Sequence, residues 1–386
     1  MKIGFICSEY PPGPHGGIGT MTQVLSRALV QDGHRVQVAG IYENEYPAPD
    51  FQDDQGVKVW RLRRSGHRLG WIPARYRLFQ LVTSWVRDKT VDVIEVPDYQ
   101  GLAAGWGPLA APVVARLHGS ETYFAKELGV PVRRGSYWIE RASLRRVDSW
   151  SSVCRYTADK TRELFRLGFE PNAILYNPVE VPIATGPTSR RRNQVVFSGT
   201  LTPKKGVVSL IRSWPKVKAA CPDAELHVYG KDGRAVSGGS MREALRAELP
   251  NALLSSVSFH GHVSRERLFE VYRSAGLAVF PSYAEAFAIA PLEAMACGCA
   301  TIYSERGSGP ELLEQDKNGL LVDPDRPDQI AESIIRTLQD DGFAERLGSA
   351  GRKLVEERFS LAGALKQNLA FYSDCIERFR LAQSLS

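Results

Sequence analysis

Cysteines are few in this sequence, and their spacing does not indicate disulfide bonds that would cross-link the chain. The six cysteines are scattered over 386 residues, and no two form a C-x-x-C pair. This spacing excludes a disulfide-rich secreted scaffold and a zinc ribbon, and it favours reduced thiols in a cytosol. The residues are Cys7, Cys154, Cys221, Cys297, Cys299 and Cys375.

Long apolar runs are also missing. No stretch reaches the roughly 20 residues that a membrane-spanning helix requires, and the apolar start of the sequence is too short for a signal peptide. The formal net charge of +6 is too small to argue for nucleic acid by itself. A hydrophobic fraction of 43% and a charged fraction of 24% are ordinary for a globular enzyme, so we expect a cytoplasmic one.

Signatures of common cofactors and metals are absent or weak. The loop G-G-I-G at residues 16–19 does not have the G-x-G-x-x-G spacing of a dinucleotide-binding loop. Asp323 and Asp325 formally make a D-x-D pair, but they precede a helix expected near Arg326, and we interpret them as helix caps. His260 and His262 have no third ligand nearby. We expect no cofactor and no obligatory metal.

Short apolar runs alternate with amphipathic helical patterns in both halves of the chain. This alternation predicts an α/β protein with parallel sheets and crossover helices. Because 386 residues exceed what one core usually organises, we predict two Rossmann-like domains, residues 1–180 and 193–364, joined by the Pro-rich, polar segment 177–193. The predicted strands occupy residues 3–8, 35–40, 57–63, 92–97, 112–118 and 148–154, then 194–198, 224–231, 277–281, 300–304 and 319–323.

The most informative segment is E-A-F-A-I-A-P-L-E, residues 285–293, which follows the apolar run 277–281. We predict a helix that begins near Phe287. Its first amides lie at the positive end of a helix dipole and suit a diphosphate. Glu285 precedes this helix end, and Glu293 lies about two turns into the helix. Such a pair suits a sugar nucleotide, with its sugar at one end and its ribose at the other. The amides concerned belong to Phe287, Ala288 and Ile289.

This segment, together with the small residues 294–301 after it, resembles the E-x7-E signature of retaining glycosyltransferases, above all glycosyltransferase family 4. Other segments agree in order along nearly the whole chain. The resemblance implies the GT-B fold, with two facing Rossmann-like domains, an interdomain cleft and a last helix, here about 365–386, that packs back on the first domain. It further implies that the first domain binds the acceptor and the second the nucleotide sugar, without an obligatory metal.

In the second domain, residues 197–207 resemble the family pattern G-R-L-x-x-x-K-G. Lys205 matches the lysine that neutralises the diphosphate and stabilises the leaving group. Thr200 stands where the family has arginine, so either Lys204, Arg306 or another group compensates, or phosphate binding is weaker.

The same resemblance implies donor-binding roles for further residues. Glu293 is expected to bind the ribose hydroxyls and Glu285 the donor sugar, and the amides of residues 287–289 the diphosphate. Backbone contacts with the nucleotide are expected at Gly199, Gly230, Gly261 and Val263.

In the first domain, His118 and Gly17 are the candidates. His118 ends a predicted strand and precedes Gly119, a position that favours a ligand site over a purely structural histidine. The resemblance implies that His118 contacts the donor sugar and that the loop containing Gly17 closes over the donor phosphates and the acceptor. Glu121 is a weaker candidate for an acceptor contact, since a helix start explains it equally well.

Two basic runs lie in the first domain. Residues 58–77 hold seven Lys or Arg and no acid, with Trp60, Trp71 and Tyr76 between them, and a second run spans residues 133–146. An anionic membrane surface or a phosphorylated acceptor suits this fold better than nucleic acid, and a merely solvated face stays open. Peripheral contact with the inner face of the membrane is therefore one expectation.

The sequence leads to one main functional hypothesis, a retaining glycosyltransferase that uses a nucleoside-diphosphate sugar and a hydroxyl acceptor. Lys205, Glu285 and His118 are its predicted catalytic residues. A sugar-nucleotide-binding partner with little activity of its own is the alternative, motivated by Thr200. A nicotinamide-dependent oxidoreductase leaves the two glutamates unexplained. Glycan, lipid-linked and small-molecule acceptors all stay open.

Overall fold

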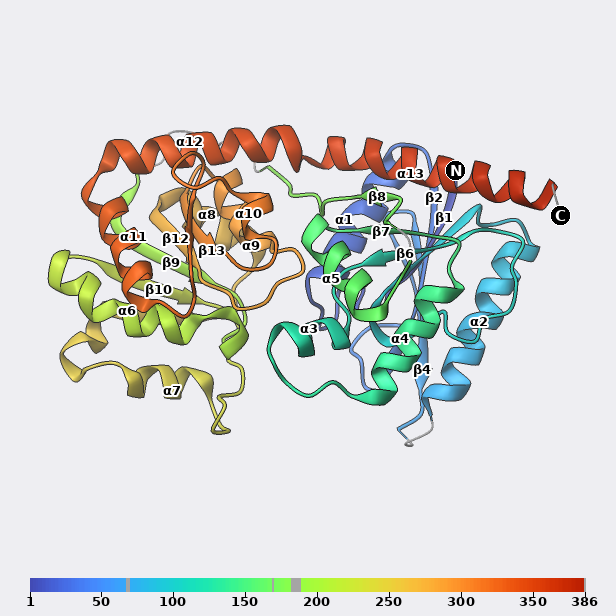
Figure 1. Ribbon diagram of the computed structural model, residues 1–386, viewed down its shortest axis with the longest axis horizontal. Coiled ribbons are helices and arrows are strands. Elements are labelled where there is room, and N and C mark those ends of the chain that lie inside the picture. The colour runs from blue at the N-terminus through green and yellow to red at the C-terminus, as the bar shows by residue number, and fades with distance from the viewer. Residues whose placement is uncertain (67–69, 169, 182–188, 385–386) are drawn as a thin grey trace. The chain divides into compact units, whose positions relative to one another are not determined.

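A computed structural model describes residues 1–66, 70–168, 170–181 and 189–384. Part of the first basic run (67–69), part of the predicted linker (182–188) and the last two residues lie outside the described residues. The chain divides into two compact units, one formed by Met1–Pro178 with Leu361–Ser386 and the other by Val179–Ser360. Each is an α/β unit built on its own parallel sheet (Figure 1).

Unit 1 contains an eight-stranded sheet in the order β3-β4-β2-β1-β5-β6-β7-β8. All neighbouring strands are parallel except β3 and β4. The strands are β1 (Lys2–Ile6), β2 (Arg35–Glu43), β3 (Phe51–Asp54), β4 (Val57–Arg64), β5 (Val93–Pro97), β6 (Val113–Leu117), β7 (Ser149–Ser152) and β8 (Ala173–Ile174). The helices are α1 (Gly17–Gln31), α2 (Trp71–Arg87), η1 (Tyr99–Gly101), α3 (Glu121–Glu127), α4 (Arg134–Arg146), α5 (Arg155–Phe165) and α13 (Leu361–Ser384).

Strand β1 lies at the centre of this sheet, and both faces of the sheet are covered. Two clusters of buried apolar side chains, one around Trp85 and Trp150 and one around Phe5 and Leu25, fill these faces. Burial on both faces explains why β1, β5 and β6 are near-continuous apolar runs rather than alternating ones.

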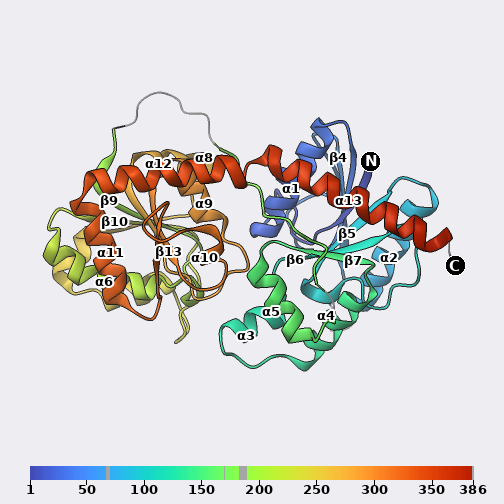
Figure 2. The same cartoon turned by 45° about the horizontal axis from the view of Figure 1, so that its top comes forward.

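The C-terminal helix α13 belongs to unit 1, where it lies beside α1 (Figures 1 and 2). Its residues Phe371, Tyr372, Cys375 and Ile376 join the apolar cluster of β1. A buried polar network completes the contact. Arg116 of β6 makes an ion pair with Glu95 of β5 at 2.9 Å and donates hydrogen bonds to Asn368 and Tyr372 of α13.

Unit 2 contains a six-stranded, wholly parallel sheet in the order β11-β10-β9-β12-β13-β14. The strands are β9 (Arg191–Ser198), β10 (Glu225–Tyr229), β11 (Val257–Gly261), β12 (Ala275–Phe280), β13 (Ala300–Ser304) and β14 (Leu320–Val322). The helices are η2 (Pro203–Lys205), α6 (Val207–Ala220), α7 (Met241–Glu248), η3 (Asn251–Ser256), α8 (Arg265–Ser274), α9 (Ile289–Ala296), α10 (Gly309–Leu312), α11 (Pro327–Gln339) and α12 (Asp341–Arg358).

Both sheets reverse their strand order at one point. In unit 1 the chain leaves β1 toward β2 and later returns to place β5 on the other side of β1; in unit 2 the same reversal lies between β9 and β12. In open parallel sheets, ligands bind beyond the carboxyl ends of the strands at such a switch point. The ends of β1 and β5, and of β9 and β12, are therefore where functional groups are expected.

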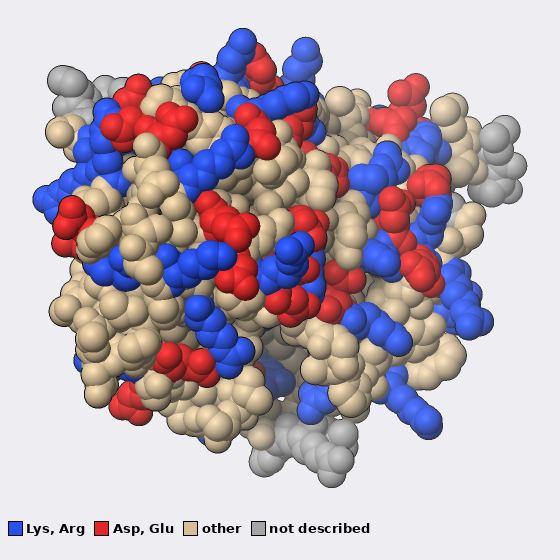
Figure 3. Space-filling view, turned by 60° about the vertical axis from the view of Figure 1, so that its left-hand side comes forward, with Lys and Arg blue, Asp and Glu red and all other residues tan. Residues whose placement is uncertain are grey.

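The modest net charge is not gathered into one area on the face shown in Figure 3, where basic and acidic side chains alternate. In the described part of the chain, no helix is both long and apolar enough to cross a membrane.

Candidate active site

The carboxyl ends of three adjacent strands in unit 2 each carry a predicted glycine. Gly199 follows β9, Gly230 follows β10 and Gly261 ends β11. The Gly199 amide donates to the carbonyl of Tyr229 at 2.9 Å, and the Gly230 amide donates to the carbonyl of Gly261 at 2.7 Å. These glycines therefore form one continuous backbone edge, and Val263 follows it in the turn before α8.

Gly230 cannot be replaced without displacing the backbone. Its φ is +140°, and a Cβ at this residue would lie 1.9 Å from the carbonyl oxygen of Gly199. The two strand ends approach so closely only because no side chain separates them. A bare backbone edge of this kind lets a flat ligand approach main-chain groups.

The switch point of unit 2 brings Lys205 and Glu285 together. Lys205 ends η2, after β9, and Glu285 lies in the loop after β12; their Nζ and Oε1 atoms are 2.5 Å apart. The Tyr283 amide donates to the carbonyl of Lys204 at 2.8 Å and so ties the two loops together. Residues 80 positions apart in the sequence thus form one ion pair.

Glu285 is buried, yet it is held in the ionised form. Burial alone would raise the pKa of its carboxyl, but Lys205 and Lys204 hold the pKa below its usual value. Conversely, burial lowers the pKa of the Lys204 ammonium, although Glu285 opposes the change. Two lysines therefore act on one buried carboxylate at this edge.

Thr200 is exposed beyond Gly199 and supplies no charge. Arg306, the other residue expected to compensate for the missing arginine, pairs instead with Asp323 at 2.9 Å and Asp325 at 2.5 Å. The interpretation of these aspartates as helix caps is wrong: Arg326 occupies the N-cap position of α11, and no side chain caps that helix. Their carboxylates are engaged by the guanidinium of Arg306. Lys204 is thus the second cation beside Glu285.

Helix α9 begins later than the sequence suggests. We expected it near Phe287, but it begins at Ile289 with Ala288 as N-cap. Phe287 therefore lies in the preceding loop. A start at Ile289 places Pro291 in the first turn of the helix, where the N–H that proline lacks would have no partner within the helix. No side chain caps this helix among the described residues. The amides of its first turn point away from the helix body, as an anion requires.

Glu293 lies in the second turn of α9, not two full turns in, and is also buried. Its Oε1 is 2.6 Å from Nε of Arg265, the first residue of α8, and this arginine also pairs with Glu180. Burial raises the pKa of Glu293, and Arg265 opposes the shift. Arg265 is a residue that sequence reasoning missed, although Ser264 just before it is a recognisable helix cap.

In unit 1, Gly17 is the first residue of α1 and is exposed. The amide of Gly19 in the same turn donates to the carboxylate of Glu9 at 2.8 Å. Burial raises the pKa of Glu9, although the amides of Gly19 and Gly16 and the charge of His15 favour its ionised form. A protein carboxylate thus already occupies the start of α1, so a second anion there would meet a like charge.

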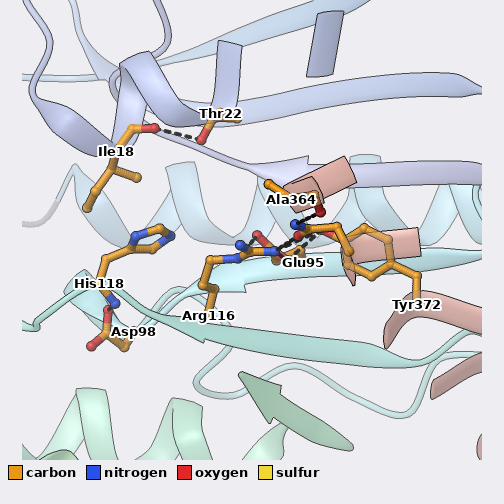
Figure 4. A network of polar contacts seen from close by, with 9 residues as sticks. Ile18, Thr22, Glu95, Asp98, Arg116, His118, Ala364 and Tyr372 are labelled. Atoms are coloured by element: carbon orange, nitrogen blue, oxygen red, sulfur yellow. Dashed lines mark hydrogen bonds and ion pairs between the residues drawn. The ribbon is translucent and has the colours of Figure 1, made fainter. Parts of the chain in front are cut away.

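His118 follows β6 and is buried, with 7% of its surface exposed. Its main-chain amide donates to Asp98 at 2.9 Å, and its imidazole lies near Arg116, which belongs to the network that anchors α13 (Figure 4). Burial and the charge of Arg116 hold the pKa of His118 well below its usual value. The imidazole is therefore neutral at physiological pH and offers one donor and one acceptor nitrogen.

Glu121 begins α3, with its side chain about half exposed. Its carboxylate accepts a hydrogen bond from Ser136 at 2.9 Å and lies 3.6 Å from Arg133. Its place at the start of a helix agrees with the structural explanation for this residue.

The cavities found among the described residues are not lined by the predicted site residues. One of about 630 Å³ opens near the amino ends of β12 and β13, where Arg190 and Arg192 line it. Arg190 donates to four main-chain carbonyls, and Arg192 pairs with Asp341 and Glu345. Both cations are thus engaged by groups of the protein. No cluster of His, Cys, Asp and Glu suited to a metal ion occurs among the described residues.

Two family models match the chain. "Glycosyl transferase 4-like domain" matches residues 16–179, and "Glycosyl transferases group 1" matches residues 185–354. The chain belongs to the glycosyltransferases of the GT-B fold and family-4 type. The resemblance seen in the sequence, the enzyme class and the α/β fold are thereby confirmed.

Relatives and solved structures cover nearly the whole chain. A glycosyltransferase of Methanocaldococcus jannaschii, itself uncharacterised, is 28% identical over 98% of this chain and 99% of its own length. A GDP-mannose-dependent phosphatidylinositol monomannoside mannosyltransferase of Mycobacterium tuberculosis is 27% identical over 92% of this chain and 93% of its own.

Two solved structures share the fold. A sucrose-phosphate synthase from Thermosynechococcus elongatus is 21% identical over 97% of this chain and 99% of its own, with a TM-score of 0.80. The Anabaena protein HepE in complex with UDP is 16% identical over 97% and 100%, with a TM-score of 0.75. The roles of individual residues in this glycosyltransferase stay predictions.

Proposed function

We propose that this glycosyltransferase is a retaining, metal-independent enzyme that transfers a sugar from a nucleoside-diphosphate sugar to a hydroxyl acceptor. The observation that carries the proposal is the pair of lysines at the switch point of unit 2, where Lys204 and Lys205 act on the buried carboxylate Glu285. The uncapped start of α9 follows the same loop. Both features suit a diphosphate.

Each group at this edge has a role in the proposal. Lys205 and Lys204 neutralise the diphosphate together with the α9 amides at Ala288 and Ile289, and Glu285 binds hydroxyls of the donor sugar. At the other end, Glu293 binds the ribose hydroxyls with the oxygen that Arg265 leaves available. The backbone at Gly261 and Val263 frames the base.

Cleavage of the bond between sugar and phosphate separates charge. The sugar ring becomes positive, and the leaving diphosphate gains negative charge on its terminal oxygens. Positioned lysines and amides that already point at these oxygens stabilise this state more than the bound donor, which is what accelerates the step. They also supply the positive charge that a metal would otherwise bring. With attack on the same face, the leaving phosphate accepts the proton of the acceptor hydroxyl.

Unit 1 is assigned to the acceptor. Neutral His118 offers a donor and an acceptor to sugar hydroxyls without bringing a charge. Because Glu9 occupies the start of α1, we assign the Gly17 turn to a neutral, hydroxyl-bearing group rather than to the phosphates. The family resemblance implied that the loop containing Gly17 closes over both the donor phosphates and the acceptor, and this assignment keeps only the acceptor.

A thermal-shift screen with UDP, GDP and ADP sugars tests the donor class, since a specific ligand raises the melting temperature by mass action. The names of the similar proteins include GDP-mannose and UDP, so both bases belong in the screen. A positive donor is then incubated with candidate acceptors, and the anomeric configuration of the product is read by NMR. We expect retention, and full activity in EDTA. Binding without transfer to any acceptor and without donor hydrolysis would favour a non-catalytic binding subunit.

We also propose that unit 1 contacts an anionic membrane surface. Nearly all exposed large hydrophobic side chains belong to this unit, among them Trp71 and Tyr76 of α2 and Trp138 of α4. Arg75 lies over the ring of Trp71 at 5.9 Å, and Arg141 over the ring of Trp138 at 5.6 Å. Aromatic rings next to cations suit the interface of an anionic bilayer.

The basic runs of the sequence contribute less to this surface than expected. Arg61 is buried and donates to main-chain carbonyls, whereas Arg63 and Arg64 pair with Asp50 and Glu43. The aromatic residues are therefore the sharper probe. Sedimentation with phosphatidylglycerol vesicles should fall when Trp71 and Trp138 are both replaced by alanine. Val236→Ala, which alters an exposed apolar residue of unit 2, is the matched control. Equal sedimentation of all three proteins would contradict the proposal.

A further inference from the structure

Two buried carboxylates lie close to His118 in unit 1. Asp98 follows β5, and Glu140 is in α4; their exposed fractions are 0% and 1%. Neither belongs to any ion pair found among the described residues. Buried carboxylates are costly unless they are paired or fully hydrogen-bonded, so their partners show what they do.

Both carboxylates bind one short stretch of main chain. Asp98 accepts hydrogen bonds from the amides of His118 at 2.9 Å and Gly119 at 3.1 Å. Glu140 accepts them from the amides of Glu121 at 3.0 Å and Thr122 at 3.2 Å. Each carboxylate uses both of its oxygens, so the segment from His118 to Thr122 is held from two sides.

The fold brings these residues together through η1. Gly101, the last residue of η1, has a φ of +56°, and a Cβ there would lie 2.4 Å from the main-chain oxygen of Ile139. Only glycine permits this approach, which packs the turn after Asp98 against the part of α4 that holds Glu140. The two acids therefore lie near enough for Glu140 to oppose the ionisation of Asp98.

We propose that Asp98 and Glu140 are positioning residues that hold the main chain of residues 118–122 and thereby fix the imidazole of His118 for the transfer reaction. The proposal rests on the assigned role of His118. Neither acid touches substrate; both act through the segment that they bind. Figure 4 shows Asp98 beneath the backbone of His118, on the side away from its imidazole.

The hold depends on the ionised form of Asp98. A carboxylate accepts both amides, but a protonated acid has one oxygen that must donate, and so it loses one of them. Among the described residues, Asp98 faces the amides of His118 and Gly119, its own amide and Glu140, and Glu140 opposes its ionisation as a like charge. Burial first, and then Glu140, raise the pKa of Asp98 to about 7, while burial raises the pKa of Glu140. The segment should therefore loosen as the pH falls below neutrality.

The first test compares the pH dependence of kcat in three proteins. In the wild type, we expect kcat to fall on the acid side of about pH 7. Glu140→Gln removes the like charge, so the pKa of Asp98 drops and the acid limb moves to lower pH, while the loss of one acceptor oxygen lowers kcat at every pH. Asp98→Asn keeps only one acceptor oxygen; kcat should fall about tenfold at pH 8 and lose this limb. KM for the donor should stay within twofold. A merely structural role would not move the limb.

The second test measures amide exchange in a peptide that covers residues 118–123, corrected for the intrinsic effect of pH. Exchange should be faster in Asp98→Asn than in the wild type, and faster in the wild type at pH 6 than at pH 8. Asp148→Asn is the matched control, because Asp148 accepts the amide of Val113 at 2.8 Å but lies at the other end of β6. It should change neither the exchange of this peptide nor the pH profile.

The outcomes separate this inference from the proposed function. An unmoved acid limb in Glu140→Gln, or unchanged exchange of residues 118–123 in Asp98→Asn, overturns the positioning role. His118→Ala at full activity instead contradicts the function assigned to His118, whatever the exchange data show. Binding of UDP or GDP without the sugar reports on the nucleotide site proposed in unit 2 and should be the same in all of these variants.

Discussion

The carboxyl ends of the two sheets in this glycosyltransferase both contain a point where the strand order reverses, but their electrostatics are opposite. At the carboxyl end of the unit 2 sheet, Lys204 and Lys205 act on the carboxylate Glu285, and no side chain caps α9 among the described residues. At the edge of unit 1, protein carboxylates already bind the main-chain amides. Glu9 does so at the start of α1, and Asp98 does so after β6.

This difference shows that a helix start or a strand end is not by itself an anion site. The same amide groups are available to a ligand in unit 2 and satisfied internally in unit 1. A diphosphate would find counter-charges in the first case and like charges in the second. A hydroxyl-bearing molecule, by contrast, binds well beside carboxylates and a neutral imidazole. We base the proposed division, an anionic donor in unit 2 and a neutral acceptor group in unit 1, on this contrast.

The strongest way to break the comparison is to remove Lys205. Lys205→Ala takes one cation from the edge and leaves Glu285 without its closest partner. We expect kcat/KM for the donor to fall at least a hundredfold, about 2.7 kcal/mol of transition-state stabilisation. Lys216→Ala, in which a surface lysine paired with Asp328 and Glu332 is removed, is the control and should stay within twofold. Near-normal turnover of Lys205→Ala would remove the basis for placing the diphosphate at this edge.

Gly230→Ala tests the bare backbone edge of unit 2. A Cβ at Gly230 would lie 1.9 Å from the Gly199 carbonyl, so the strand ends must separate. Donor affinity, measured by calorimetry, should fall about tenfold, or roughly 1.4 kcal/mol. Gly238→Ala is the matched control: its φ of +86° imposes a comparable backbone strain, but no atom lies within 4 Å of the added Cβ. Equal losses in the two variants would mean that strain, not the edge, is responsible.

Glu9→Gln probes the opposite edge with a smaller expected effect. The amide oxygen of glutamine still accepts from Gly19, but the charge is lost. We expect KM for the acceptor to rise about threefold, since a hydrogen bond to a charged group is stronger than one to a neutral group by up to about 1 kcal/mol. Donor affinity should not change. A loss of donor affinity equal to the rise in acceptor KM would show that the two edges do not divide the substrates.

The sequence predicted the scaffold well because buried parallel strands are near-continuous apolar runs. Each of the predicted strand segments, from residues 3–8 to residues 319–323, contains a strand. Strands β3, β8 and β11 are not among these segments, since none of them is a continuous apolar run. A local pattern could therefore indicate the α/β class and the strand ends at which ligands bind.

The partners of the site residues could not be predicted, because they are distant in the sequence. Nothing near Glu293 indicates Arg265, and nothing near His118 indicates Asp98. The predicted start of α9 was too early, because the side chains of Phe287 and Ala288 suit a helix. The tertiary contacts of the preceding loop decide where the helix begins. The basic run around Arg61 was predicted to lie at the surface, because a charged residue in a sequence gives no sign that its side chain is buried.

The smallest effect is expected from the Lys205–Glu285 pair, whose contribution can be tested through the pH dependence of stability. The pKa of Glu285 is lower in the folded protein than its usual value of 4.5. Its ionised form therefore stabilises the fold above pH 4.5, and this contribution is lost as the pH falls through the lower, folded-state pKa. Glu285→Gln cannot lose a charge, so its free energy of unfolding in urea should fall less steeply than that of the wild type below pH 4.5. The matched variant Glu248→Gln removes an exposed carboxylate paired with Arg212 and should show a smaller change. Parallel curves for the wild type and Glu285→Gln would mean that the lysines do not hold this carboxylate ionised, which would remove the electrostatic argument for placing the diphosphate at this edge.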